Sequence, residues 1–339
     1  MTTILIILVI SSLSLVILWQ TKILSKKYNF IDNPASEIKK IHKIPISNIG
    51  GLACLLPFLL SVTISPFIEE YFSKKYLFII FFSSILYFFL GRYDDLKNIA
   101  PSIKFFCFIF IFLFLYPFEP YLIINNLNFK YFNWIINLGN YGIFFTLFCM
   151  FLFFNASNFI DGVNGLYAST IIFWIIALMF LTNIFSIIYF IVILSLIYFL
   201  YYNLKNVVFF GNSGNAFLTC FVGSAYIFSY NKFSNIFCDE IFFLFLIPGL
   251  DTIRLIFERL FRGNSPLKGD NRHLHHLLIN ILSEKFAWIF NLLIIVIPIF
   301  LLKIFQNPFV IFFVIILIYV TLILYLTRQS KKIDDTLIH

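Results

Sequence analysis

PFVIFFVIILIYVTLILYLT, residues 308–327, is a run of twenty residues without one charged side chain. A run of this length and composition is long enough to cross the apolar core of a bilayer as one helix. Similar runs recur along the whole chain, which is 61% hydrophobic and 12% charged, against about 25% charged in soluble globular proteins. The sequence therefore predicts an integral membrane protein with α-helical spans.

We predict an all-α polytopic fold with eleven transmembrane helices, in a single domain over residues 1–339. The predicted spans are residues 2–20, 50–68, 76–92, 103–120, 141–157, 166–182, 184–202, 214–230, 240–258, 286–304 and 308–327. Between the fourth and fifth, YLIINNLNFKYFNWIINLGN (121–140) alternates polar and apolar residues, which is typical of a short β-hairpin.

Lys and Arg are distributed unevenly between the two sets of loops that these spans create. Of the 24, 19 lie in residues 21–48, 92–104, 158–165, 203–213, 254–285 and the tail from 328. Because positive residues remain in the cytoplasm, these loops are predicted to be cytoplasmic, with the N-terminus and the hairpin outside and the C-terminus inside. The net charge of +8 is then explained by basic loops beside anionic lipid, without a nucleic-acid partner.

Every dense polar motif falls on this predicted cytoplasmic face, which indicates one site at one membrane surface. GRYDDLKN (91–98) places Asp94 and Asp95 side by side at the end of the third span. Two adjacent carboxylates near the membrane repel each other, and a divalent cation with phosphate partners would stabilise them. The alternative is a helix end whose acidic residues are balanced by Arg92 and Lys97.

NASNFIDGVNGL (155–166) carries Asn155, Asn158 and Asp161 at every third position. A helix ending here would present all three on one stripe, and Gly162 and Gly165 would then break the helix and expose backbone N–H groups. A carboxylate at membrane depth indicates function. The alternative is a capped turn rich in Asn and Gly.

GDNRHLHH (269–276) holds three of the five histidines. In a helix His273 and His276 share a face, and in a strand His273 and His275 do, so we expect at most two rings to come together. Mixed with Asp270 and Arg272, the imidazoles suit an anionic ligand better than a zinc site.

Three further motifs lie in the same set of loops. In PGLDTIR (248–254), Asp251 and Arg254 form either a helix-end ion pair or a phosphate site in which Arg254 or Arg259 binds the ligand. FFGNSGNAFL (209–218) is either an anion-binding helix N-terminus or a tight turn. In DNPASEIKKIHKIP (32–45), His42 and its Lys neighbours suit a diphosphate or lipid headgroups.

Taken together, these motifs resemble the polyprenyl-phosphate N-acetylhexosamine-1-phosphate transferases of glycosyltransferase family 4. The resemblance runs from about residue 30 to 285, and HxHH is similar to the N-acetylglucosamine-1-phosphate branch. The motifs that carry it are DxP…H…P…GG (Asp32, Pro34, His42, Pro45, Gly50, Gly51), GxxDD (Gly91, Asp94, Asp95), NxxNxxDGxxGL (Asn155 to Leu166), PxxDT (Pro248, Asp251, Thr252) and DxxHxHH (Asp270 to His276).

The resemblance implies a multi-pass enzyme of the bacterial plasma membrane. It would transfer HexNAc-1-phosphate from a UDP-HexNAc, by default UDP-GlcNAc, to polyprenyl (undecaprenyl) phosphate, with Mg²⁺ or Mn²⁺, and release UMP. This step would begin a cell-surface glycan of O-antigen, teichoic acid or capsule type, and a homodimer is among the expected assemblies.

The candidate site residues fall into three groups by their expected roles. The catalytic residues are Asp94, Asp95, Asp161, His273, His275 and His276; the substrate-binding residues are His42, Lys43, Asn155, Asn164, Gly165, Arg254, Asp270 and Arg272; the metal ligands are Asp95, Asn158 and Asn212. Asp94 would orient or deprotonate the lipid phosphate, which attacks the β-phosphorus of the nucleotide sugar.

The sequence departs from the family at Asn212, where the family commonly has an Asp that is expected to bind the metal. An Asn still offers a carbonyl oxygen but removes a charge, so metal binding should be weaker. Two other classes are the alternatives: a polytopic transporter, which should place ionisable groups near the bilayer midplane, and a lipid-binding relative with impaired activity.

Overall fold

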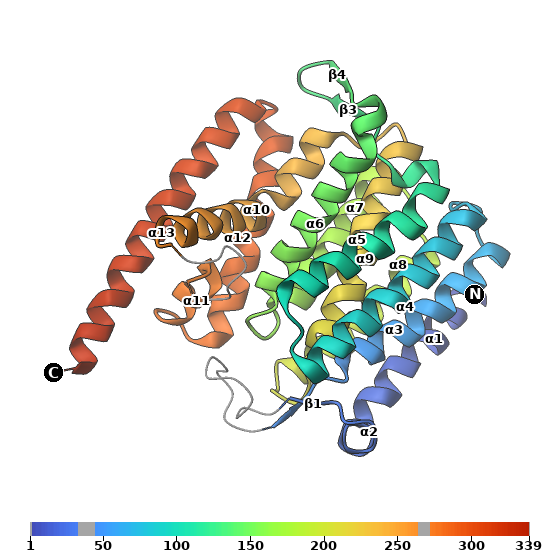
Figure 1. Cartoon of the computed structure of the whole chain (residues 1–339), viewed down its shortest axis with the longest axis horizontal. Helices are drawn as coiled ribbons and strands as arrows, with labels where there is room; N and C mark the ends of the chain where they lie inside the picture. The colour runs from blue at the N-terminus through green and yellow to red at the C-terminus, as the bar shows by residue number, and fades with distance from the viewer. Residues whose placement is uncertain (1, 33–44, 264–271, 339) are drawn as a thin grey trace. The chain divides into compact units, whose positions relative to one another are not determined.

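The computed structural model describes residues 2–32, 45–263 and 272–338 (Figure 1). Each predicted span coincides with a helix. These helices are α1 (Thr2–Trp19), α3 (Gly50–Ile64), α4 (Lys74–Lys97), α5 (Pro101–Leu115), α6 (Gly142–Ile160), α7 (Leu166–Thr182), α8 (Ile187–Asn203), α9 (Gly211–Lys232), α10 (Cys238–Phe261), α12 (Glu284–Phe305) and α13 (Pro308–Ile338). The short helices α2 (Thr21–Lys27) and α11 (Leu274–Ile279) and four 3₁₀ turns, η2 (Ser65–Phe67), η3 (Tyr116–Phe118), η4 (Pro120–Leu122) and η5 (Gly139–Tyr141), complete the described helical structure.

Within the described residues, seven helical segments are long and apolar enough to cross a membrane. They are Thr2–Trp19, Gly50–Phe67, Lys74–Lys97, Pro101–Phe118, Gly139–Ile160, Phe286–Phe305 and Pro308–Ser330, and α7 and α8 are shorter apolar helices. The prediction of an all-α polytopic membrane protein is confirmed. Helices α9 and α10 are as long but contain more polar residues, so the crossing of the membrane by these two stays a prediction.

In the part of the chain that the structure describes, two small sheets accompany the helices. Strands β1 (Ile31–Asp32) and β2 (Ile46–Ser47) pair antiparallel, with Ile31 opposite Ser47. Strands β3 (Asn126–Phe129) and β4 (Trp134–Asn137) pair across a four-residue turn, which confirms the hairpin predicted within residues 121–140 (Figure 1).

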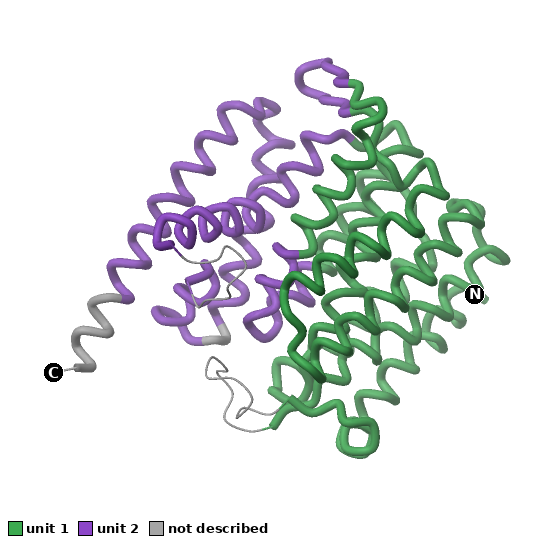
Figure 2. Tube along the Cα trace, viewed as in Figure 1, with its two compact units in different colours: residues 1–126, 137–154, 171–236 green, residues 127–136, 155–170, 237–339 purple. Residues whose placement is uncertain are grey.

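The chain forms two compact units (Figure 2). Unit 1 consists of residues 1–126, 137–154 and 171–236, and unit 2 of residues 127–136, 155–170 and 237–339. The assignment of residues 1–339 to a single domain stays a prediction.

Helix α9 forms the core of unit 1. Every side chain from Ser213 to Tyr230 is buried, and α4 and α3 pack along it. Because α9 contacts protein instead of lipid, it tolerates small and hydroxyl-bearing residues that would be unfavourable against hydrocarbon. Its surroundings therefore account for its more polar composition.

Glycines allow α3 and α4 to approach the N-terminus of α9 closely. A Cβ atom on Gly51 would lie 2.5 Å from the backbone nitrogen of Gly214, and one on Gly91 would lie 2.2 Å from the carbonyl oxygen of Asn212. Small residues at such crossings bring helix backbones into contact. As a result, the start of α9 lies against the C-terminal end of α4, which carries Asp94 and Asp95.

The polar loops of unit 1 divide between its two ends as the sequence predicts. At one end the β1–β2 region, the end of α4 and the start of α9 meet: Arg92 donates to the carbonyl of Asn29, and the backbone nitrogen of Gly50 donates to Phe209. At the other end Ser186 donates to the Glu69 carboxylate and Ser73 to Glu119. The side of the membrane that each end faces stays a prediction.

Unit 2 has the hairpin at one end and the histidine motif at the other. Near the hairpin, the fully buried Glu240 forms ion pairs with Lys130 and Lys303, and Asp239 accepts a hydrogen bond from the backbone nitrogen of Tyr131. These contacts anchor the hairpin to the first turn of α10. Helices α10, α11 and α13 all pack on α12.

Replacing Gly51 by Ala should destabilise unit 1, because the new methyl group would force the α3 and α9 backbones apart. We expect a loss of about 1–3 kcal/mol, measured as a lower midpoint of thermal unfolding of the purified protein in detergent. Gly249→Ala on α10 is the matched control, since no atom lies within 4 Å of the position that its new Cβ would take. Equal midpoints for Gly51→Ala and Gly249→Ala would contradict the close helix crossing.

Candidate functional site

Asp94 closes the last turn of α4 and is 3% exposed. One carboxylate oxygen accepts a hydrogen bond from the backbone nitrogen of Ile99 at 3.1 Å, and the other forms an ion pair with Lys104. Lys104 lies in the first turn of α5, so the pair links two consecutive helices. The carboxylate of Asp94 is thus satisfied within the protein itself.

The neighbouring Asp95 is bound differently, at the N-terminus of α9. Its two carboxylate oxygens accept hydrogen bonds from the backbone nitrogens of Asn212 at 2.8 Å and Ser213 at 3.2 Å. Gly211 has a φ of +68°, which turns the chain into α9 so that these N–H groups point at the carboxylate. The first N–H groups of a helix have no intrahelical acceptor and carry a partial positive charge, which favours an anion.

The anion-binding helix N-terminus predicted for FFGNSGNAFL therefore binds Asp95. Each carboxylate oxygen has more than one lone pair, so both oxygens keep acceptor capacity beyond these bonds. The two carboxylates consequently differ in how available they are to bind a cation. Asp94 is neutralised by an ammonium group, whereas Asp95 is held by backbone amides and remains half-buried.

The NASNFIDGVNGL segment adopts the helix-then-turn shape that the sequence predicts. Helix α6 ends at Ile160, residues 161–165 form a turn with Gly165 at a φ of +84°, and α7 begins at Leu166. Asn158 is exposed on the last turn of α6, and Asp161 and Asn164 are half-buried in the turn.

All three histidine rings lie together, so the expectation that at most two would do so is wrong. His273 is the extended N-cap of α11, and His275 and His276 lie in the first turn of that helix. The ring centroids are 5.5 Å apart for His273 and His275, 6.4 Å for His273 and His276, and 4.2 Å for His275 and His276. Neither regular form applies, because the chain changes from strand-like to helical backbone at His273.

His275 packs directly on the turn that follows Asp161. It is 4% exposed, its Nε2 has no hydrogen-bond partner within the described residues, and a Cβ atom on Gly162 would lie 2.4 Å from that nitrogen. Burial lowers the pKa of His275 well below its usual value, and the neighbouring His276 and His273 lower it further. His275 is therefore a neutral imidazole at physiological pH.

A small pocket lies beneath this histidine in unit 2. Most of its wall is apolar, and His275, Asp251, Thr252 and the buried Asn291 of α12 are its polar members. Buried polar groups in an apolar wall orient a bound polar group.

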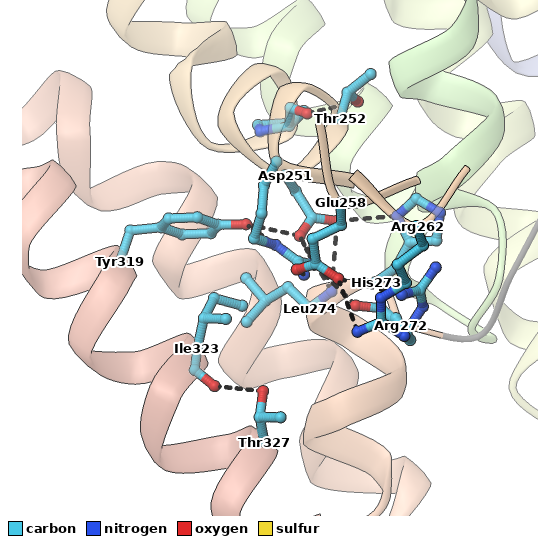
Figure 3. Close-up of polar contacts among 12 residues, drawn as sticks. Asp251, Thr252, Glu258, Arg262, Arg272, His273, Leu274, Tyr319, Ile323 and Thr327 are labelled. Atoms are coloured by element: carbon cyan, nitrogen blue, oxygen red, sulfur yellow. Dashed lines mark hydrogen bonds and ion pairs between the residues drawn. The ribbon is translucent and has the colours of Figure 1, made fainter. Parts of the chain in front are cut away.

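Asp251 is the centre of the polar cluster in unit 2 (Figure 3). It accepts hydrogen bonds from Arg254 at 2.8 Å and from Nδ1 of His273 at 2.9 Å. Arg254 also donates to Glu258, Tyr319 and the carbonyl of Arg272. All three guanidinium nitrogens of Arg254 therefore donate to groups of the protein. Of the two interpretations of PGLDTIR, these contacts favour the helix-end ion pair.

The sequence-predicted residues form two groups, one in each unit. Asp94, Asp95 and Asn212 come together in unit 1; in unit 2, the histidines pack on the 161–165 turn and on Asp251, and Arg272 contacts Glu258. The union of the two groups in one site stays a prediction. His42, Lys43 and Asp270 lie outside the described residues.

Lys104 and Tyr319 are among the residues of these clusters that were not predicted from the sequence. Lys104 is the only charged residue in the 103–120 span apart from Glu119 near its end, and that isolation in an apolar run was a usable signal. Tyr319 donates to Asp251 from the middle of an apolar helix at 2.7 Å. With 18 Tyr in the chain, its sequence context does not distinguish it from the others.

The residues available for a divalent metal are few. Within the described residues, no three His, Cys, Asp or Glu side chains gather as ligands. Mg²⁺, however, is typically held by one or two carboxylates together with water and substrate phosphates. Asp95, with its remaining lone pairs, fits this role, whereas Asp94 is occupied by Lys104. The donor set suits a cation whose ligands the substrate completes.

Comparisons with known proteins agree with the motifs. The sequence model described as Glycosyl transferase family 4 matches residues 77–230. The chain is 24% identical over 274 residues to the undecaprenyl-phosphate alpha-N-acetylglucosaminyl 1-phosphate transferase of Escherichia coli K12, covering 75% of this chain and 70% of the relative. It is 26% identical over 290 residues to the protein of the same name from Thermotoga maritima, covering 80% and 83%. The predicted resemblance to this family is confirmed.

Replacing Lys104 by Met should destabilise the protein, because the buried Asp94 carboxylate would lose its counter-charge. We expect a loss of about 1–3 kcal/mol, which is less than the roughly 3–5 kcal/mol typical of a fully buried pair, because Lys104 is partly exposed. The double variant Asp94→Asn/Lys104→Met should recover much of this loss in thermal unfolding. Lys97→Met, which removes an exposed charge at the end of the same helix α4, is the control. Additive effects of Asp94→Asn and Lys104→Met would exclude a coupled pair.

Proposed function

We propose that this chain, which the family match and the relatives' names indicate to be a sugar-phosphate transferase of glycosyl transferase family 4, acts on polyprenyl phosphate and a UDP-HexNAc. It would transfer HexNAc-1-phosphate, with GlcNAc as the first candidate sugar, and release UMP. The observation that supports this most is the Asp94–Asp95 pair at the end of a membrane helix, with one carboxylate paired to Lys104 and the other at a helix N-terminus.

This arrangement suits a reaction between two anions. The lipid phosphate cannot leave the headgroup layer, so its partner groups must lie at helix ends. Lys104 offers the lipid phosphate a cation, and Asp94 holds the ammonium in place. We therefore assign Asp94 to orienting the acceptor through Lys104 in preference to deprotonating it, because its carboxylate already has partners on both oxygens.

Asp95 would be the main protein ligand of Mg²⁺ or Mn²⁺, with Asn158 and Asn212 as the further predicted ligands. When bound, such a cation neutralises charge on the diphosphate and its leaving group. Asn212 adds no negative charge beside Asp95, so the metal would depend more strongly on substrate phosphates than in a site with a second carboxylate. Asp161, Asn164 and Gly165 are assigned to the nucleotide and the histidine motif to the sugar diphosphate.

The product of this reaction is a polyprenyl-diphospho-sugar, on which further sugars are assembled into a cell-surface glycan. We propose that the enzyme works in a bacterial plasma membrane with the motif-bearing loops in the cytoplasm, where nucleotide sugars are available. This orientation follows from the distribution of Lys and Arg among the loops.

The test is a transfer assay with the purified full-length protein in lipid nanodiscs, undecaprenyl phosphate and a panel of UDP-sugars. UMP release and the mass of the lipid product are measured together. We expect a UDP-HexNAc to give both products, chelation of divalent cations to abolish both, and added Mg²⁺ to restore both. UMP release that does not require the lipid acceptor, or the absence of any lipid-linked product across the panel, would refute the proposal.

Single substitutions test the assigned residues in the same assay. Asp95→Asn and Asp161→Asn should each lower kcat by about a hundredfold or more, in the range expected when a charged group that acts on the transition state is removed. Glu70→Gln changes an exposed carboxylate between α3 and α4, at the opposite end of unit 1, and should leave the rate unchanged. Near-normal rates in Asp95→Asn would remove that residue from the site.

A further inference from the structure

The Asp251 carboxylate is held by donors from three parts of unit 2. Tyr319 of α13 donates its hydroxyl at 2.7 Å, Arg254 of α10 donates at 2.8 Å, and the backbone nitrogen of Leu274 donates at 3.3 Å (Figure 3). Nδ1 of His273 completes the set at 2.9 Å. Because the tyrosine and the arginine are fixed to their helices, the carboxylate has little freedom to turn.

This carboxylate determines which ring nitrogen of His273 carries a proton. An ionised carboxylate can only accept hydrogen bonds, so the contact with Nδ1 requires an N–H at that position. In the neutral imidazole, Nε2 then has a free lone pair on the side of the ring away from Asp251. Asp251 thus selects one of the two tautomers.

The described charged groups around His273 supply positive charge without a proton on Nε2. The carboxylates of Asp251 and Glu258 face three guanidinium groups: Arg254 and Arg272 contact them directly, and Arg262 lies 4.0 Å from Glu258. Among the described residues, the other titratable or charged groups on the surrounding elements are His275 and His276 of α11, Tyr319 of α13, Arg259 of α10, whose guanidinium lies over the Phe159 ring, and Asp161, which adjoins the Gly162 that His275 packs on.

The ring of His273 is also held by contacts with two other rings. The Phe159 ring packs on it with the centroids 4.5 Å apart, and the His275 ring is nearly parallel to it at 5.5 Å. His273 itself is 3% exposed. With the ring packed and Nδ1 engaged, its polar edge at Nε2 is the part left to meet a ligand.

We propose that Asp251 and Tyr319 are positioning residues that hold His273 as a neutral, Nδ1-protonated imidazole, whose Nε2 accepts a hydrogen bond from an uncharged donor on the sugar. This inference rests on the proposed function, since it names the part of the nucleotide sugar that His273 contacts. Phosphate oxygens are acceptors and would be repelled by the Nε2 lone pair, whereas the hydroxyl and acetamido N–H groups of a HexNAc are donors. His273 therefore recognises the sugar instead of the diphosphate.

The first test needs no activity. The full-length protein is labelled with ¹⁵N-histidine in detergent, and the His273 signals are assigned by their loss in His273→Gln. At neutral pH we expect a protonated Nδ1 and an unprotonated Nε2 in the wild type. In Asp251→Asn the selection of this tautomer should be lost, because an amide can also donate to Nδ1. An imidazolium, or the Nε2-protonated tautomer, in the wild type would overturn the proposal.

The second test compares Asp251→Asn with Tyr319→Phe, each of which should raise KM for the nucleotide sugar more than for the lipid acceptor. For Asp251→Asn we expect a fall in kcat/KM of about 10- to 100-fold, as is typical when a group that orients a ligand-contacting histidine is removed. Tyr325→Phe is the matched control, because Tyr325 lies on the same helix and is 56% exposed. A rise in KM for the lipid acceptor as large as that for the nucleotide sugar would contradict the proposal.

Failure of this inference is distinguishable from failure of the proposed function. If the wild type makes no lipid-linked sugar from any donor but shows the expected tautomer, the transferase proposal fails and the positioning of His273 by Asp251 stands. If transfer occurs but Nε2 of His273 is protonated, the function stands and the positioning proposal is overturned.

Discussion

A carboxylate on a long, largely apolar helix must receive hydrogen bonds or a counter-charge from another segment, because neither lipid nor its own helix supplies enough. Asp94 obtains Lys104 from α5, Asp95 the first amides of α9, and Asp251 the hydroxyl of Tyr319 from α13. Each acid thereby ties together two helices that hydrophobic contact alone would let slide or rotate. The chemistry of the motif-bearing ends and the packing of the helices thus depend on the same contacts.

Within unit 1 this dependence is geometric. The backbone amides of Asn212 and Ser213 reach Asp95 only because Gly91 and Gly51 let α4 and α3 approach the start of α9 without intervening side chains. The positive φ of Gly211 then directs those amides at the carboxylate. A single added methyl group at these crossings would therefore alter the position of Asp95 as well as helix packing.

The helices and the turn after α6 could be predicted from the sequence, because long apolar runs and glycine-rich breaks are local signals. All the predicted spans are helices, and Gly165 ends the turn after α6 as expected. The hydrogen-bond and ion-pair partners of the polar residues could not be predicted, because they depend on how the helices pack against one another. The three histidines were expected to behave as a helix or as a strand, and the change of backbone at His273 brought all three rings together. The sequence left open whether Arg254 pairs with Asp251 or binds a phosphate, and in the structure its guanidinium is fully engaged by the protein.

The division of labour among the polar groups follows from charge. A neutral, deeply buried His275 and a His273 whose Nδ1 is committed to Asp251 have no spare positive charge for phosphate. Lys104 and the amides of α9 are cationic or partly positive and lie at the carboxylate pair instead. In the proposed reaction, which joins a lipid phosphate to a sugar phosphate, Lys104 and the α9 amides would offset the repulsion between the substrates. His273 and His275 would discriminate between sugars, since an uncharged acceptor distinguishes donors by geometry and adds little to the attraction of anions.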